Sequence, residues 1–490
     1  MSDVVPPTLT GWLRDTFDDP TLAVRRYDRL AGGAIQQNMA LDVARDGGAS
    51  TEALVLRTDA PSGVSVSRTR AEEHALLAAA FDAGVTVPEP LALCTDERVL
   101  GRPFFLMRRV SGTTHPVRLT RGDDLEDGDR ESLVDALGAE LARIHAVPLD
   151  APGLRFLSSA DAEGGAAGGH APVRRVARYR RLLDELGAHR PVLEWALSWL
   201  ERQTVTAHGP TLCHNDFRTG NLMIGTVGAN AGSRTSDGSA EGPCVTGVLD
   251  WEFAAVGDPH EDIGWFCAPC WRFAAREREA GGLGSREAFY AGYERASGRT
   301  IDRAAVPIWE IVATVRWAVI ALQQGARFTS GAEPTLELGL TGRMIAELEQ
   351  DVLTLVLAAS NRPEPEPDPG IAATGERGMA GVARLADDAP SGAALLASAR
   401  RTFLDRLLPT LPDERRYEGL MIANAMGVAE RELAGRRDVF DENERIELCR
   451  RLRRGIEGSD EELVARLGDD VVRRLRLANP KRVISRKASS

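Results

Sequence analysis

The sequence lacks an excess of positive charge, a long hydrophobic run and a basic N-terminal leader. Its 490 residues carry 72 acidic and 60 basic side chains, which gives a formal net charge of −12. A general nucleic-acid-binding protein shows a basic footprint instead, so we expect no nucleic-acid partner. No run of 18 or more apolar residues occurs, which predicts no membrane-spanning helix. No basic region precedes an apolar one at the N-terminus, so we expect no signal peptide and a cytoplasmic location.

Cysteine is too scarce and too scattered for a disulfide framework. The six cysteines are spread along the whole chain, whereas small secreted domains concentrate theirs in a short sequence. Cys267 and Cys270 form one close pair, and a zinc site would need a second close pair, but Cys213 and Cys244 are far apart. The aromatic residues around Cys267 favour buried, hydrophobic thiols. We therefore expect core thiols at this pair.

The first part of the chain has the pattern of a sheet interrupted by one helix. Alternating residues over 22–60, separated by glycine-bearing turns, predict strands. A helical pattern follows over 68–84 and stops at a glycine. Residues 87–112 predict two further strands. An antiparallel sheet with one inserted helix is therefore expected over roughly the first 110 residues.

The rest of the chain is predicted to be mainly helical, with two interruptions. Apolar stripes recur at helical spacing from about residue 128 to 360. Within this part, residues 225–244 are rich in glycine, alanine and serine, which predicts a flexible loop between two short strands. Alternating proline and glutamate after residue 360 predict an extended linker. The predicted divisions, in chain order, are 1–110, 111–360, 361–387 and 388–490.

The segment LCHNDFRTGNLMI, residues 211–223, places several polar side chains between apolar flanks. Asp216 and Asn221 are five residues apart, the spacing of the base and the amide metal ligand in the protein-kinase catalytic loop. Asp250 follows an apolar strand in VTGVLDWEF, as the second metal ligand does there. Phosphoryl transfer needs such a set, because a carboxylate accepts the hydroxyl proton and oxygen ligands hold magnesium. The alternative is that all three are ordinary turn and capping residues.

Beyond this motif, the sequence resembles the aminoglycoside phosphotransferase-like (APH) family of the kinase-like fold. HNDFRTGN resembles its catalytic loop and GVLDWEFAAVGDPHEDIGWF its metal-binding segment, and the likeness covers about residues 25–350. It is closest to the subgroup with kinase-like domains linked to acyl-CoA dehydrogenases. The last helices resemble a helical domain of unknown function that often accompanies such enzymes. The resemblance implies an α+β, bilobal protein-kinase-like fold, with a sheet-plus-helix N-lobe and a helical C-lobe, followed by a small all-α domain.

The resemblance also implies a role for each polar residue of the motif. Asp216 is the implied catalytic base. Asn221 and Asp250 are the implied ligands of Mg²⁺. Asp262, in GDPHEDIGW, is implied to brace the catalytic loop by accepting its backbone N–H groups. His214 is expected to hold the loop rather than to carry a proton, because Asp216 already fills the role of base.

In the N-terminal part, the resemblance implies a nucleotide site. Arg57 stands where the fold usually has its phosphate-binding lysine, and Glu73 where its partner glutamate lies. Arginine keeps the charge and can bind phosphate through two N–H groups, although its geometry differs. The alternative is a plain surface salt bridge. The turn AGGAIQQN, with Gly32 and Gly33, takes the place of the nucleotide-covering loop, since glycine lets the backbone approach phosphate. The adenine is expected against the strand at 105–109.

These implications predict a kinase that uses ATP and Mg²⁺ to phosphorylate the hydroxyl of a small molecule. The arginine-rich segment 172–181 suits an anionic acceptor, such as a hydroxyacyl-CoA, better than a polycationic aminoglycoside. Arginine runs on helices are, however, usually solvated faces. One alternative is a catalytically weak nucleotide-binding or scaffold protein, and another is a hydrolase with a metal-bound water. The C-terminal helices are the expected site for a protein partner or an oligomer contact.

Overall fold

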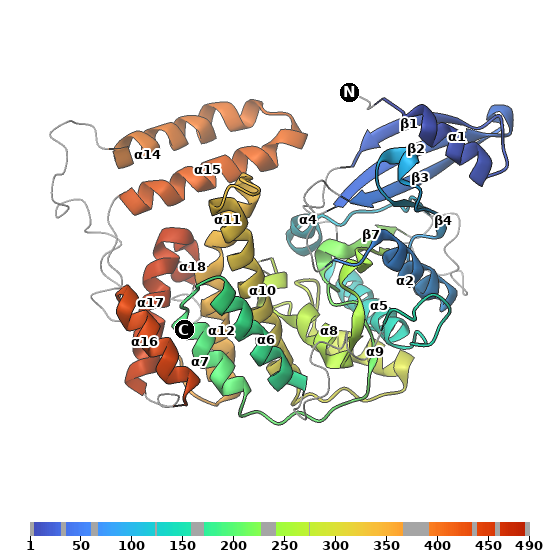
Figure 1. Cartoon of the computed structure of the whole chain (residues 1–490). Coiled ribbons are helices and arrows are strands. Elements are labelled where there is room, and N and C mark those ends of the chain that lie inside the picture. Colours follow the sequence, from blue (N-terminus) through green and yellow to red (C-terminus); the bar gives the residue numbers. More distant parts are fainter. Residues whose placement is uncertain are drawn as a thin grey trace. The chain divides into compact units, whose positions relative to one another are not determined.

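The computed structural model divides the chain into two compact units, each made of two separate segments. Unit 1 comprises residues 1–168 and 206–309, and unit 2 comprises residues 169–205 and 310–490 (Figure 1). The structure describes residues 4–30, 36–59, 67–122, 125–157, 171–226, 242–273, 275–365, 392–433, 439–455 and 461–485.

Unit 1 begins with a five-stranded antiparallel sheet in the order β1-β2-β3-β5-β4. Among the described residues of this region three α-helices accompany it, and the one between β3 and β4 is the helix that the sequence predicted. The sheet and its inserted helix confirm the expected sheet-plus-helix N-lobe. The elements are α1 (Pro7–Thr16), β1 (Ala23–Arg29), β2 (Gln36–Arg45), β3 (Ser50–Asp59), α2 (Arg70–Asp82), β4 (Pro90–Cys94), α3 (Glu97–Leu100) and β5 (Phe104–Arg108).

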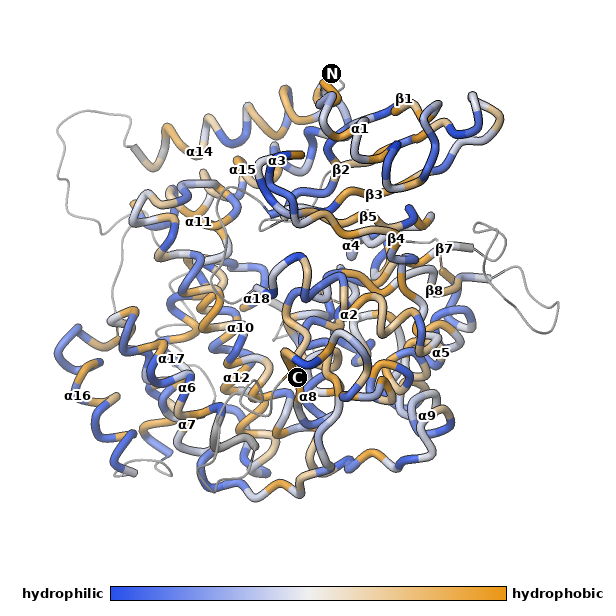
Figure 2. Tube along the Cα trace, turned by 45° about the vertical axis from the view of Figure 1, so that its right-hand side comes forward, coloured by the Kyte–Doolittle hydropathy of each residue, from blue (hydrophilic) through white to orange (hydrophobic). Residues whose placement is uncertain are grey.

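Alternation along the strands explains why this sheet buries both of its faces. Phe104 and Leu106 point to one side and pack in a cluster with Leu9 and Leu13 of α1. Phe105 points to the other side, where it joins the cluster that includes residues of α2. Successive side chains of a strand point to opposite faces, so β5 serves both clusters. Figure 2 shows the hydrophobic character of β3 and β5.

Helix α2 begins at a capping box that is visible in the sequence. The Thr69 hydroxyl accepts the backbone N–H of Glu72, and the Glu72 carboxylate accepts the backbone N–H of Thr69. This reciprocal pair satisfies two N–H groups that a helix start otherwise leaves unbonded. The helix start also fixes Glu73, the next residue, in a buried position.

The remainder of unit 1 is mainly helical and carries two small antiparallel pairs, β6 with β9 and β7 with β8. The predicted short strands on either side of the glycine-rich segment are therefore present, while most of that loop lies outside the described residues. The elements are α4 (Pro116–Arg121), α5 (Asp127–His145), β6 (Thr211–Cys213), β7 (Leu222–Thr226), β8 (Pro243–Val248), β9 (Ala255–Gly257), α8 (Pro259–Cys267) and α9 (Arg286–Ser297).

Helices α5 and α9 cross so closely that two glycines are required at the contact. A Cβ on Gly292 would lie 1.9 Å from the carbonyl oxygen of Asp135. A Cβ on Gly138 would lie 2.1 Å from the carbonyl oxygen of Phe289. Real Cβ atoms do not approach backbone this closely, so glycine sets the distance between the two helices.

The regular elements of unit 2 are helices throughout its described residues. Its helices α7 and α12 pack against the C-terminal helices α16 and α17. The contacts thus group parts of the predicted C-lobe with the C-terminal helices, and the sequence-based boundaries at 110, 360 and 388 stay predictions. Most of the predicted linker lies outside the described residues. The helices are α6 (Ala171–Glu185), α7 (Pro191–Leu200), α10 (Val306–Thr329), α11 (Leu336–Arg343), α12 (Ile345–Ala359), α14 (Gly392–Thr402), α15 (Asp413–Leu433), α16 (Glu442–Arg453), α17 (Glu461–Ala478) and α18 (Pro480–Ser485).

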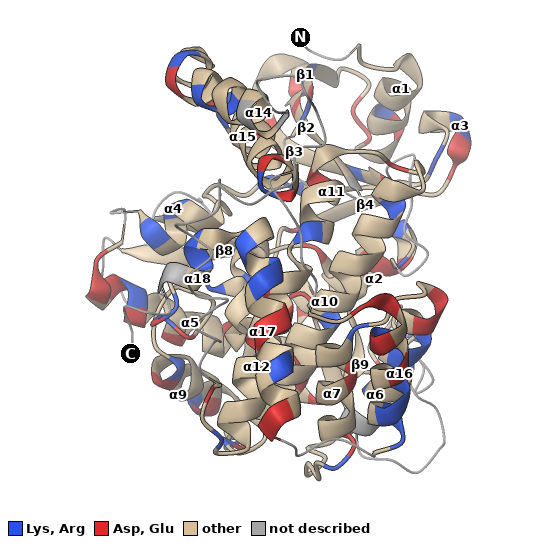
Figure 3. Ribbon diagram, turned by 90° about the vertical axis from the view of Figure 1, so that its left-hand side faces the viewer, with Lys and Arg blue, Asp and Glu red and all other residues tan. Residues whose placement is uncertain are grey.

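Ion pairs with buried carboxylates tie these helices of unit 2 together. Glu194 of α7 pairs with Arg453 of α16 at 2.5 Å. Glu349 of α12 pairs with Arg474 of α17, whose Nε also lies 2.8 Å from Asp470. Figure 3 shows both charge signs on α12 and α17. A buried charge that loses its partner is strongly destabilising, so these pairs make the C-terminal helices part of the fold of unit 2.

Two expectations concern helix α10 and the cysteines. By length and composition, α10 could cross a membrane, with a mean hydropathy of 1.3 in its most apolar stretch, but 61% of that stretch is buried inside the protein. A core helix of a soluble protein passes the same test, so the expected absence of a membrane span stays a prediction. The cysteines are free thiols, and of the close pair Cys267 is buried and Cys270 is half-buried.

Candidate active site

The catalytic loop predicted from the sequence connects β6 to β7 in unit 1. It bends sharply at Asn215, whose φ of 62° lies in the left-handed region that non-glycine residues seldom adopt. Asp250, at the end of β8, adopts the same conformation with a φ of 64°. The backbone N–H of Leu249 donates to the carbonyl of Asn221 at 2.9 Å, so the loop and the segment after β8 lie side by side.

The side chain of Asp262, in α8, stabilises the bend through hydrogen bonds to its backbone. Its two carboxylate oxygens accept the backbone N–H groups of His214 and Asn215, each at 2.7 Å. The side chain of His145 lies 3.2 Å from the same carboxylate. Burial raises the pKa of Asp262, but the hydrogen bond and charge of His145 and the contacts with His214 outweigh it, so the pKa lies below its usual value. The geometry is that of a loop brace, the role that the family resemblance implies.

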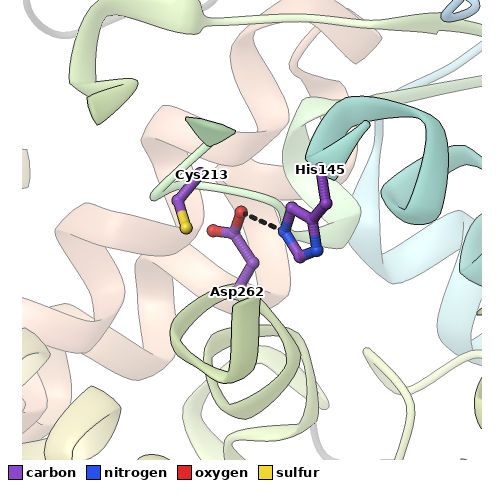
Figure 4. Close-up of side chains that lie close together, drawn as sticks. All are labelled: His145, Cys213 and Asp262. Atoms are coloured by element: carbon purple, nitrogen blue, oxygen red, sulfur yellow. Dashed lines mark hydrogen bonds and ion pairs between the residues drawn. The ribbon is translucent and has the colours of Figure 1, made fainter. Parts of the chain in front are cut away.

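Figure 4 shows His145 and Asp262 beside Cys213, a buried trio whose ligand atoms lie close enough to hold a metal ion. The hydrogen bonds of these three side chains indicate a structural role instead. Asp262 already accepts two backbone N–H groups, and the other ring nitrogen of His145 lies 2.9 Å from the Tyr293 hydroxyl. Burial raises the pKa of the Cys213 thiol, and the thiol donates to a backbone carbonyl. The trio thus anchors the catalytic loop.

A second group at the start of α8, His208 with Asp258 and His260, is likewise structural. The Nε2 atom of His260 accepts the backbone N–H of Asp302 at 3.1 Å, so Nδ1 carries the proton and donates to Asp258 at 3.0 Å. A neutral histidine in this tautomer has no lone pair toward the group's centre. Asp258 is the N-cap of α8 and accepts the backbone N–H of His260.

His214 is satisfied on both ring nitrogens. Its Nε2–H donates to the carbonyl of Leu249 at 3.0 Å, and its Nδ1 accepts the backbone N–H of Asp216 at 3.2 Å. Burial lowers the pKa of His214. A neutral imidazole with both nitrogens bonded holds the loop in shape and carries no proton to a substrate.

The carboxylate of Asp216 is surrounded by three donors. The Nδ2 atom of Asn221 donates to Oδ2 at 2.6 Å and also to the Asp216 carbonyl, which leaves the amide oxygen of Asn221 for a cation. The Nε atom of Arg218 donates to Oδ1 at 3.1 Å. The indole Nε1–H of Trp265 donates to the same Oδ1 at 3.1 Å. The structure therefore brings the predicted base and the predicted amide ligand into direct contact.

Arg57 of β3 is the centre of a second cluster. It pairs with Glu73 of α2 at 2.9 Å and with Asp250 at 2.7 Å, and it is only 4% exposed. The pair with Glu73 is therefore buried, unlike the surface salt bridge considered from the sequence. Both carboxylates keep the pKa of Arg57 above its usual value despite burial. Burial raises the pKa of Asp250, but the charges of Arg57 and Arg218 lower it below its usual value.

A cavity of about 310 Å³ opens on this cluster within unit 1. Its charged lining includes Arg57, Glu73 and Asp250, together with Arg108 and Arg109. Its apolar wall comes from the β3–β5 region and from β7 and β8, including Val55, Leu77, Phe105, Met107, Met223 and Val248. The strand segment expected to hold adenine thus lines the cavity. Gly32 and Gly33, the predicted nucleotide-covering turn, lie outside the described residues.

Sequence reasoning missed Arg218, Trp265 and Trp271. The guanidinium of Arg218 lies 4.8 Å from the ring centre of Trp271, and the rings of Trp271 and Trp265 are 5.1 Å apart. One signal was available, because Arg218 is inside the quoted motif, two residues after Asp216. Trp265 gave a weaker signal: it lies three residues after Asp262, hence on the same face of a helix.

Three features together define a kinase-like, small-molecule phosphotransferase fold. They are the sheet-plus-helix lobe, the braced loop and the cavity with an arginine–glutamate pair. The chain belongs to the phosphotransferase enzyme family (APH), whose family model matches residues 27–306. A candidate aminoglycoside phosphotransferase from Ralstonia eutropha has the same fold, with a TM-score of 0.53 and 22% identity over 72% of this chain and 98% of its own.

The curated relatives are longer proteins. Acyl-CoA dehydrogenase family member 10 of Mus musculus is 31% identical over 216 residues, which are 44% of this chain and 18% of the mouse protein. Acyl-CoA dehydrogenase family member 11 of Gallus gallus is 29% identical over 199 residues, which are 39% of this chain and 22% of the chicken protein. The chain thus matches less than a quarter of the length of either relative. These relatives agree with the subgroup that the sequence resembled.

Proposed function

We propose that this protein is a kinase that transfers the γ-phosphoryl group of ATP to a hydroxyl group of a small molecule, with Mg²⁺ as cofactor. The observation that carries the proposal is the joining of Asp216, Asn221 and Asp250 in one site of unit 1. Oxygen ligands suit magnesium, and the carboxylate of Asp250 and the amide oxygen of Asn221 are such ligands. When bound, the metal neutralises phosphate charge and orients the transferred group.

The remaining catalytic roles are assigned to residues of the chain. Asp216 accepts the proton of the acceptor hydroxyl, and its carboxylate is held in place for this by Asn221. Arg57, fixed by Glu73 in the cavity wall, supplies a charge that stays positive at every physiological pH and can bind phosphate oxygens. Catalysis then rests mostly on positioning and electrostatics, as is general for phosphoryl transfer.

For the acceptor we propose an anionic molecule, such as a hydroxyacyl-CoA, rather than an aminoglycoside. Arg218 lies 3.1 Å from the carboxylate of Asp216, so an ammonium group next to the reacting hydroxyl would meet a positive charge. The names of the relatives, acyl-CoA dehydrogenase family members, motivate the acyl-CoA class. The arginine-rich helix α6 gives less support than its sequence promised, because Arg180 is engaged by Glu194 and Glu201.

A second candidate is a nucleotide-binding or scaffold protein with little turnover. The observation that favours it is that both proposed catalytic carboxylates already pair with arginines, Asp250 with Arg57 and Asp216 with Arg218. These pairs must loosen before metal and acceptor can bind. A protein partner at the C-terminal helices fits this candidate, while the cytoplasmic location and the absence of nucleic-acid partners remain predictions of either.

The test is ADP release from Mg-ATP by the wild type and by Asp216→Asn. The acceptors are hydroxyacyl-CoAs, simple hydroxy acids, sugars and aminoglycosides. We expect one class to stimulate release, and Asp216→Asn to lower the stimulated rate by roughly 10²- to 10⁴-fold, the usual contribution of a general base. Mg-ATP binding, followed by thermal shift, should stay close to that of the wild type.

Three results would count against the proposal. Stimulated release that survives Asp216→Asn contradicts the assignment of the base. Mg-ATP binding without release by any acceptor favours the scaffold candidate, and release that no acceptor stimulates but that needs Mg²⁺ favours a hydrolase.

A further inference from the structure

Helix α8 contacts the catalytic loop at two places, one turn apart. Asp262 holds the backbone N–H groups at 214 and 215, as described above. Trp265, three residues later on the same face of the helix, donates its indole N–H to the carboxylate of Asp216. Asp262 thus fixes the backbone of the catalytic loop at residues 214 and 215. Trp265 fixes the side chain of the proposed base, Asp216, which follows them in the loop.

We infer that Trp265 is the positioning residue of the Asp216 carboxylate. The inference rests on the proposed kinase function and adds to it a residue that orients the base. Trp265 is buried, and its indole N–H points at the Oδ1 atom, the same atom that Arg218 contacts. Nothing in the catalytic motif itself supplies this donor, because it comes from a helix 49 residues further along the chain.

The surroundings of Trp265 explain why the indole keeps its place. Asp216, Trp265, Trp271 and Arg218 form a closed ring of contacts: indole to carboxylate, indole to indole, guanidinium over indole and guanidinium to carboxylate. Trp271 is also buried, so two large rigid side chains support each other against the loop.

The two donors to Oδ1 differ in how firmly they are held. Arg218 is a long side chain, about a quarter exposed, and its charge can be drawn away by a phosphate or by an anionic acceptor. The Trp265 indole is buried and has no such freedom. When Arg218 turns to a ligand, Trp265 and Asn221 remain to keep the carboxylate aimed at the acceptor hydroxyl.

The contact is tested first without any turnover. The chain has eight tryptophans, so the ¹⁵N spectrum of its indole groups is small enough to assign by single substitutions. Trp265→Phe should remove the signal of Trp265, and Trp309→Phe that of a matched control. Trp309 is equally buried, but its Nε1 has no hydrogen-bond partner among the described residues. We expect Asp216→Asn to shift the Trp265 signal and to leave the Trp309 signal in place.

The consequence is tested by steady-state kinetics with Mg-ATP and hydroxybutyryl-CoA, and with water as the sole acceptor. Trp265→Phe keeps the ring packing and removes the N–H, so we expect kcat to fall roughly 10- to 100-fold, the effect of a misplaced catalytic group. The KM for Mg-ATP should change less than twofold, because Trp265 does not line the nucleotide cavity. Trp309→Phe should change neither constant, and melting temperatures establish that both variants fold.

The inference is overturned if the Trp265 signal ignores Asp216→Asn, or if Trp265→Phe turns over as fast as Trp309→Phe. Failure of the kinase proposal looks different. In that case no acceptor supports ADP release by the wild type, while the Trp265 signal still responds to Asp216→Asn and confirms the positioning contact.

Discussion

At the scale of single residues, the site assigns each carboxylate a different kind of partner. Asp262 accepts backbone N–H groups, Asp250 pairs with a buried guanidinium, and Asp216 accepts from an indole, an amide and an arginine. Backbone donors cannot move away, whereas Arg57 and Arg218 can exchange their partners for phosphate. The brace is therefore permanent, and the two reactive carboxylates are the ones whose partners a ligand can replace.

This difference predicts how Asp262 contributes to stability. The pKa of Asp262 in the folded state lies below its usual value, so its contribution to stability is fully present above about pH 4 and is lost as the pH falls through the folded-state pKa. We expect Asp262→Asn to lower the free energy of unfolding by about 2–3 kcal/mol at pH 7, since it leaves a backbone N–H unbonded. Below pH 4 the difference from the wild type should shrink. Urea unfolding at several pH values measures both effects.

A matched control for this prediction is Asp127→Asn, whose carboxylate is 92% exposed. It should leave the free energy of unfolding within error of the wild type at every pH. An unchanged stability of Asp262→Asn at neutral pH would mean that the backbone bonds of the loop have other acceptors.

At the scale of elements, the position of the site depends on how closely helices and strands approach. Helix α5 carries His145, which contacts the brace, and α5 is set against α9 by the glycines of their crossing. A change in that spacing would move His145 relative to Asp262. The packing of α5 against α9, at a distance from Asp216, thus influences the shape of the catalytic loop.

We therefore expect Gly292→Ala to be destabilising. Its Cβ would lie 1.9 Å from the carbonyl oxygen of Asp135, so the helices must separate, at a cost of about 1–3 kcal/mol or more for overpacking. Gly128→Ala, on the same helix pair but with nothing within 4 Å of its Cβ, should be neutral or stabilising by up to about 1 kcal/mol. Thermal unfolding of both variants is the measurement. Equal melting temperatures would contradict the close crossing.

The sequence could predict the elements whose signals are local. Alternation predicted the strands of the N-lobe, and the Thr69–Glu72 box lies at the start of the predicted helix. The spacing of Asp216 and Asn221 likewise predicted that both belong to one catalytic loop, and in the structure their side chains are in contact. These signals lie within a few residues of one another. Each depends on the backbone geometry of one segment.

Contacts between distant segments could not be predicted in this way. The pair of Arg57 with Asp250 joins residues from two lobes, and the Trp265 contact joins a helix to a loop. No periodicity or spacing encodes which two side chains of separate elements will meet. The grouping of α7 and α12 with the C-terminal helices was unexpected for the same reason, since contacts such as the ion pairs of Glu194 and Glu349, and not chain order, decide it.

At the scale of the whole molecule, unit 2 combines a central segment, residues 169–205, with residues 310–490 at the C-terminal end. We therefore expect a chain that ends at residue 387 to fail to fold as a stable protein. It would remove Arg474 from the buried Glu349, and it would leave the buried Glu194 with Arg180 but without Arg453. Size-exclusion chromatography and thermal melting by circular dichroism should show aggregation or no cooperative transition.

A milder change tests the same idea in the full chain. Arg474→Met removes one partner of a buried pair and should cost about 3–5 kcal/mol. Arg415→Met removes a partner of Glu418 in an exposed pair and should cost at most about 1 kcal/mol. A soluble, cooperatively melting chain 1–387, together with equal costs for the two variants, would show that the C-terminal helices are a dispensable addition.

The pair of Glu194 with Arg453 can form only late during synthesis of the chain. The two residues are separated by 259 positions, so the ribosome must add that length before the pair can form. At the usual rates of elongation this takes roughly 10 to 50 seconds. During that interval Glu194 has Arg180 as a partner but not Arg453, and α7 lacks the packing of α16. The nascent chain therefore has a long window in which a chaperone can bind it, and slower translation of the C-terminal half would lengthen that exposure.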